Sequence, residues 1–104
     1  MEIQQLRGFV AVAEHKNFTR AAAATFRSQP AISLQIKALE EEMGVQLIRR
    51  EPGREIELTI EGEALYRLAI RLLEEVDSMK LKIAPSRKDQ GAGSLRVITD
   101  LTSM

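Results

Sequence analysis

Residues 18–37 read FTRAAAATFRSQPAISLQIK, and this stretch decides the fold of the 104-residue chain. An alanine-rich run is followed by Ser28-Gln29-Pro30, in which a serine cap and an early proline begin a second helix. The segment predicts two short helices joined by a tight turn, a helix-turn-helix over residues 18–37. Asn17 is the expected N-cap of the first of these helices, because its side-chain oxygen can accept a hydrogen bond from an unpaired helical amide.

Charge is unevenly distributed around this segment. The 15 Lys and Arg residues of the chain balance its 15 Asp and Glu residues, yet residues 15–39 contain no acid. Lys16, Arg20, Arg27 and Lys37 supply positive charge there. An acid-free helix-turn-helix favours contact with phosphates and indicates a DNA-binding segment. The neutral chain as a whole does not favour nucleic acid, so the local distribution of charge alone supports this hypothesis.

The helix expected after Ser28, which should end at Gly44, has two different faces. Its buried stripe follows helical spacing and consists of Ile32, Ile36, Leu39 and Met43. Its outward face carries Gln29, Pro30, Ser33, Leu34 and Lys37. The acids at 40–42 would repel phosphates at the end of the helix. Only its N-terminal half is therefore expected to face a duplex, as in recognition helices that enter a major groove.

A small β-wing is predicted after this helix. Residues 45–50 and 56–58 resemble two short strands around the turn Glu51-Pro52-Gly53-Arg54. Arg50 and Arg54 are candidate contacts to the DNA backbone. These arginines alternate with glutamates, so an ordinary solvated hairpin remains an alternative.

One long helix is expected over residues 59–84, with Thr59 as its cap. Its apolar residues are spaced by alternating steps of four and three, as in a heptad seam. The seam consists of Leu65, Ala69, Leu72, Val76, Met79 and Ile83. About 25 helical residues extend roughly 37 Å, more than the domain predicted at 1–58 can cover. We therefore expect a second copy of the chain to cover the seam in a homodimer.

The C-terminal segment and the composition bound the remaining possibilities. Residues 85–94 resemble a hinge, and residues 95–104 resemble the first strand of a truncated further domain.

The chain has no cysteine, which excludes disulfides and thiolate zinc sites. It shows no signal peptide and no apolar run long enough to cross a membrane, so a cytoplasmic location is expected.

Two other function classes compete with DNA binding. For an enzyme, His15 lacks a recognisable partner, and neither catalytic residues, a metal site nor a cofactor is predicted. A purely structural module, which dimerises and binds an acidic protein through its basic segment, is a stronger alternative. Sequence-selective binding to DNA would separate it from a regulator.

With these motifs in place, residues 1 to about 90 resemble the N-terminal domain of LysR-type transcriptional regulators. The resemblance is based on LRGFVAVAEHKNFTRAA, on SQPAISLQIKALEEEMG and on LTIEG before a long helix. It implies a mainly α winged helix-turn-helix that dimerises through the linker helix and reads an inverted-repeat operator. It also implies a tetrameric full-length bacterial regulator with a separate domain for a small-molecule effector.

The resemblance assigns roles to individual residues. Gln29, Pro30 and Ser33 correspond to positions that face the groove, and the Gln29 amide could read adenine. Leu34 stands where many members carry arginine, which puts a guanine contact in doubt; Thr25, Ile48 and Glu61 also depart from the usual pattern. The full set of expected DNA contacts is Thr19, Arg20, Arg27, Ser28, Gln29, Pro30, Ser33, Leu34, Lys37, Arg50 and Arg54.

Overall fold

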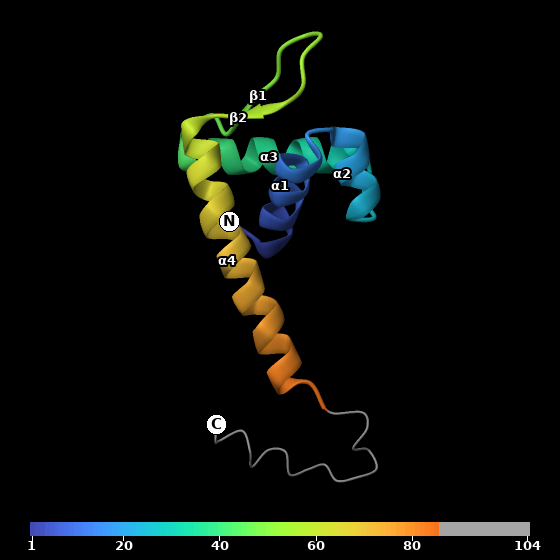
Figure 1. Cartoon of the computed structure of the whole chain (residues 1–104), viewed down its shortest axis with the longest axis vertical. Coiled ribbons are helices and arrows are strands. Elements are labelled where there is room, and N and C mark those ends of the chain that lie inside the picture. The colour runs from blue at the N-terminus through green and yellow to red at the C-terminus, as the bar shows by residue number, and fades with distance from the viewer. Residues whose placement is uncertain (86–104) are drawn as a thin grey trace. The chain divides into compact units, whose positions relative to one another are not determined.

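Four helices and a two-stranded antiparallel hairpin form the part of the chain that the structure, a computed structural model, describes, residues 1–85 (Figure 1). The elements in chain order are α1 (Ile3–His15), α2 (Phe18–Ala24), α3 (Gln29–Met43), β1 (Ile48–Arg49), β2 (Glu57–Leu58) and α4 (Ile60–Ile83). This is the predicted mainly α winged helix-turn-helix. The strand predicted at 95–104 and all of the predicted hinge except Pro85 lie outside the described residues.

The predicted helix caps are confirmed by hydrogen bonds. Asn17 Oδ1 accepts from the Arg20 amide at 2.8 Å, and Ser28 Oγ accepts from the Ala31 amide at 3.2 Å. Thr59 Oγ1 accepts from the Gly62 amide at 2.9 Å. Gly44 ends α3 in the left-handed conformation, with φ +71°. Local sequence signals therefore fix where α2, α3 and α4 begin and where α3 ends.

The first three helices pack around one hydrophobic core. Figure 1 shows α1 lying against α3, with α2 near the N-terminal end of α3. The predicted stripe of α3 is buried except for Met43, which is only half-buried. Ala21 and Ala22 of α2 are also buried, which agrees with small residues permitting close approach between helices. The fully enclosed core side chains are Phe9, Val12, Ala21, Ile32, Ile36 and Leu39.

The first half of α4 belongs to the same compact unit, which extends from Met1 to Leu73. Ala69 and Leu73 are buried against Leu6 of α1, with Leu65 packed beside them. The unit therefore extends past the boundary that the sequence suggests at residue 58. Ala69 was predicted to meet a second chain; that expectation is wrong, because Ala69 is buried within its own chain, whereas Leu65 of the predicted seam is only half-buried.

A polar contact also joins α1 to this half of α4. The Tyr66 hydroxyl donates to Glu14 Oε2 at 3.0 Å. This hydrogen bond, followed by burial and the Glu14 charge, raises the pKa of Tyr66 above its usual value. The neutral phenol is the form that makes the contact, so its small stabilising effect is present below the usual tyrosine pKa and is lost as the pH rises through the raised value.

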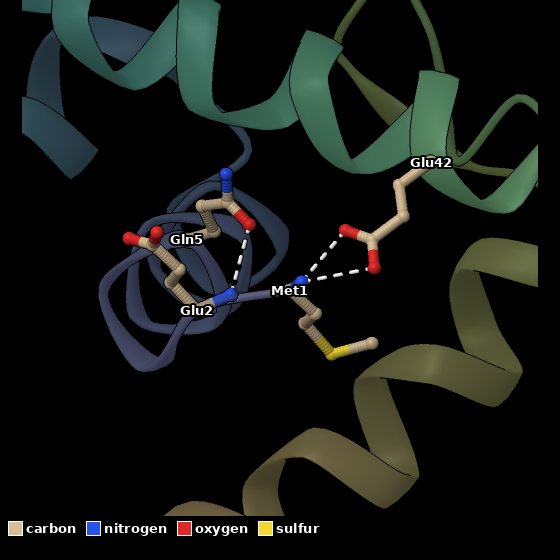
Figure 2. Close-up of polar contacts among 4 residues, drawn as sticks. All are labelled: Met1, Glu2, Gln5 and Glu42. Atoms are coloured by element: carbon tan, nitrogen blue, oxygen red, sulfur yellow. Dashed lines mark hydrogen bonds and ion pairs between the residues drawn. The ribbon is translucent and has the colours of Figure 1, made fainter.

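The N-terminus contacts the end of α3. The Met1 ammonium lies 2.8 Å from Glu42 Oε1 and donates to Oε2 at 2.9 Å (Figure 2). Beside it, the Glu2 amide donates to Gln5 Oε1 at 3.0 Å in the first turn of α1 (Figure 2). Glu42 thus joins the N-terminus to α3 as well as adding charge to the end of α3.

Glu40 anchors the base of the wing. Its Oε2 accepts from the amides of Leu47 and Ile48 at 2.9 and 3.3 Å. The strands pair Ile48 with Leu58 and Arg49 with Glu57, and they are shorter than predicted. The Glu40 carboxylate therefore satisfies backbone donors just where the chain leaves α3 and enters β1.

A Glu40→Ala variant is expected to lose about 1–3 kcal/mol of unfolding free energy, because two partly buried amides lose their acceptor. Glu41→Ala is the matched control: it removes the same charge from the adjacent, exposed position, and should change stability by less than about 0.5 kcal/mol. Urea denaturation followed by circular dichroism measures both. Equal midpoints for the two variants would contradict the anchoring role.

Candidate nucleic-acid interface

The N-terminal half of α3 presents its predicted outward face to solvent. Gln29 and Pro30 occupy the first turn, after the Ser28 cap. Leu34, one turn further on, is 67% exposed. Ser33 is half-buried, whereas the exposed candidates on α2 and α3 are Thr19, Arg20, Ser28, Gln29, Pro30, Leu34 and Lys37. The structure therefore gathers polar, apolar and basic side chains on one short helical surface.

One hydrogen bond joins the two helices of the motif at this surface. The Thr19 hydroxyl donates to Gln29 Oε1 at 3.3 Å, and both residues are exposed. Ten residues separate them in sequence. The sequence placed both residues at the candidate interface but gave no indication that they contact each other.

The turn between α2 and α3 is a helix C-terminal motif with an unusual residue at its left-handed position. The Arg27 amide donates to Ala22 O at 2.9 Å and the Phe26 amide to Ala23 O at 3.3 Å, the pattern of a Schellman motif. Phe26 has φ +57° and is 96% exposed. Glycine usually occupies this conformation, so the tight turn forms at a cost of about 1–2 kcal/mol.

Arg27 does not join the other candidates. Its side chain is half-buried, and its guanidinium Nη2 donates to Gln4 Oε1 of α1. The guanidinium thus uses one of its donors within the protein, and a DNA contact by Arg27 stays a prediction. Arg27 follows directly on the left-handed Phe26, and sequence spacing alone could not show which way the chain would turn it.

The wing places its two arginines differently. The Arg50 guanidinium carbon lies 4.8 Å from the centroid of the Phe18 ring, at the first residue of α2. This cation–π contact attaches Arg50 to the helix-turn-helix. Arg54 lies in the exposed turn, where its Nε is 3.8 Å from Glu51 Oε1. Phe18 thus holds the wing through Arg50. The sequence did not reveal this contact, because the two residues lie 32 positions apart.

The comparisons with known proteins agree with this geometry. Residues 3–63 match the model of the family described as "Bacterial regulatory helix-turn-helix protein, lysR family". The chain belongs to the LysR family. The match covers α1, α2, α3 and the wing, and it ends in the first turn of α4.

Curated relatives of this LysR-family chain are transcriptional regulators. It is 48% identical over 79 residues to the HTH-type transcriptional regulator BenM of Acinetobacter baylyi, a match of 76% of this chain and 26% of BenM. It is 53% identical over 78 residues to BudR of Klebsiella aerogenes, a match of 75% of this chain and 54% of BudR. The chain thus spans about a quarter of BenM and about half of BudR.

A solved structure similar to this LysR-family chain contains DNA. The crystal structure of the BenM_DBD/catB site 1 DNA complex matches it with a TM-score of 0.77 at 42% identity, covering 91% of this chain and all of that one. The sequence identity and the structural similarity support the same winged helix-turn-helix fold in both proteins.

Residues 1–85 also bear on metal sites and membrane spans. This range holds no group of three or more His, Cys, Asp or Glu side chains placed to bind a metal ion. None of its helices is both long enough and apolar enough to span a bilayer.

Proposed function

We propose that this LysR-family domain binds duplex DNA with sequence preference, as the DNA-recognition part of a bacterial transcriptional regulator. The observation that carries the proposal is the exposed first half of α3, where Gln29 and Leu34 face solvent within an acid-free segment. Two of the three acids of α3 support other parts of the fold, because Glu40 holds the wing and Glu42 the N-terminus. The likeness to a BenM domain solved with DNA supports the same function.

The side chains divide into base-reading and backbone-positioning groups. Gln29 and Ser33 can hydrogen-bond base edges in the major groove, and Pro30 can contact a thymine methyl group. Leu34 has no donor for guanine, so any contact there is apolar. The phosphate contacts in this proposal are Arg20, Ser28, Lys37, Arg50 and Arg54, while Thr19 lies beside Gln29.

A homodimer through α4 is part of the proposal. Leu72, Met79 and Ile83 are 45%, 56% and 72% exposed, and Val76 is half-buried. These four residues continue the heptad spacing beyond the half-buried Leu65 and the buried Ala69. An isologous pair of α4 helices would present two recognition helices to an inverted-repeat operator.

The whole protein would act as a regulator in the bacterial cytoplasm, where the DNA is. Tetramer assembly and a small-molecule effector would belong to a further domain outside the described residues. The proposed activity is binding, without catalysis or a cofactor, and the likeness to HTH-type transcriptional regulators supports it.

Selection of duplexes from a random pool by the purified chain tests this function. We expect an enriched palindrome with two spaced half-sites. With Gln29→Ala, the preference at one base pair of each half-site should relax, and affinity for the selected duplex should fall about tenfold to hundredfold. The slope of affinity against salt should stay nearly unchanged, because that residue neutralises no phosphate.

Two results would count against DNA recognition. Binding that fades with salt and enriches no sequence would leave a basic module that binds acidic partners. Absence of binding to any duplex at low salt would remove DNA from the proposed function altogether.

Dimerisation has its own test. The double variant Leu72→Glu/Met79→Glu places two charges on the remaining seam and should sediment as a monomer, whereas the unmodified chain should sediment as a dimer. Leu81→Glu is the control, because Leu81 is 80% exposed and lies on the opposite face of α4 from the seam. A dimeric double variant would place the subunit interface elsewhere.

A further inference from the structure

Gln29 is held from outside its own helix. It is the first residue of α3, where a side chain lacks a preceding helical turn to pack against. Its side chain is exposed. Without a partner, its rotamers and the two flipped orientations of its amide group would be close in energy. The Thr19 hydroxyl, which donates to Gln29 Oε1 at 3.3 Å, removes part of that freedom.

The two helix starts set the backbone positions of Thr19 and Gln29. The Asn17 cap sets the beginning of α2, and the Ser28 cap sets the beginning of α3. Thr19 lies two residues after the first cap, and Gln29 lies one residue after the second. The distance between them therefore depends on backbone positions that the capped helices and the buried Ala21 and Ala22 determine.

The orientation of this amide matters because its two ends differ chemically. The oxygen accepts and the nitrogen donates. In the major groove adenine presents one donor and one acceptor, whereas guanine presents two acceptors. With Oε1 accepting from the Thr19 hydroxyl, one oxygen lone pair and both N–H groups remain for the groove. An amide fixed in this way can match fewer base edges than one that rotates freely.

We propose that Thr19 is a specificity-determining positioning residue, whose hydroxyl orients the Gln29 amide and so sets the base that Gln29 selects. This inference depends on the proposed function, since it assumes that Gln29 faces a base pair. It gives Thr19 a role different from the phosphate contact that its place on α2 suggests.

The test compares Thr19→Val, which keeps the shape and removes the hydroxyl, with Thr19→Ser, which keeps the hydroxyl. Affinities are measured for the selected operator and for duplexes changed symmetrically at one base pair of each half-site. Thr19→Val should reduce discrimination about threefold to tenfold at the same base pair that Gln29→Ala affects. Thr19→Ser should retain it, and both variants should keep the salt slope of the unmodified chain.

A second readout does not depend on DNA. In the free protein, the side-chain amide of Gln29 should have a lower NMR order parameter in Thr19→Val than in Thr19→Ser. Because position 19 is exposed, neither substitution disturbs the core, and thermal unfolding of the two variants confirms that both are folded.

The possible failures are distinguishable. If Thr19→Val weakens binding to every duplex equally, Thr19 is a phosphate contact and the inference is overturned. Unchanged discrimination and unchanged amide order would overturn it as well. If Gln29→Ala itself alters no base preference, the proposed reading by Gln29 fails, and the role of Thr19 fails with it.

Discussion

Gly62→Ala is expected to destabilise the domain by about 3 kcal/mol, even though alanine is the better helix former. A Cβ atom at this position would lie 2.1 Å from the carbonyl oxygen of Leu47. That oxygen accepts the Thr59 amide at 3.0 Å, and the Leu47 amide is held by Glu40. The backbone around Leu47 therefore cannot move aside without breaking the base of the wing.

Helix propensity and the steric overlap predict opposite signs for the change in the free energy of unfolding. Helix propensity alone would predict a gain of about 1 kcal/mol for the substitution. Gly44→Ala provides the contrast, because a Cβ there meets no atom within 4 Å but must adopt φ +71°. It should cost only the strain of the left-handed conformation, about 1–2 kcal/mol. Urea denaturation of both variants would contradict the proposed close approach if Gly62→Ala matched or exceeded the stability of the unmodified chain.

Leu34→Glu should abolish measurable DNA binding, by a factor of at least about 100, while leaving the fold intact. Leu34 is 67% exposed on α3, in the same outward face as Pro30 and Lys37. A carboxylate there would meet the phosphates and base acceptors of the groove, and juxtaposed like charges cost several kcal/mol. Stability should change little, because the leucine buries little surface.

The control is the same substitution at another exposed leucine. Leu81→Glu alters a side chain that is 80% exposed on α4, and it should leave DNA affinity within about threefold of the unmodified chain at the same salt concentration. Fluorescence anisotropy with the selected operator measures both. Equal affinity of Leu34→Glu and Leu81→Glu would show that this face of α3 does not enter the groove.

Local signals in the sequence determined the helix-turn-helix and the limits of its helices. A side-chain cap acts on amides within three residues, and a helical stripe reflects only the 3.6-residue period. For this reason the sequence alone predicts the caps at Asn17, Ser28 and Thr59 and the helix end at Gly44, and the structure confirms all four. The resemblance to LysR-type regulators also followed from contiguous motifs, and the family match confirmed it.

Contacts between distant residues were decided only by the tertiary structure. Heptad spacing identifies the apolar side of α4 but not what covers it, so the sequence assigned Ala69 to a partner when α1 of the same chain buries it. Likewise, charge alone could not separate Glu40, which holds the wing, from the exposed Glu41.

At the candidate interface, too, the sequence does not show which residues contact each other. Arg27 and Arg50 are equally basic in the sequence, yet the structure pairs one with Gln4 and stacks the other on Phe18. The sequence alone predicted which residues could meet DNA, because residue type and helical period are local properties. Their partners and orientations depend on how helices pack across long sequence separations, and those were decided by the tertiary structure.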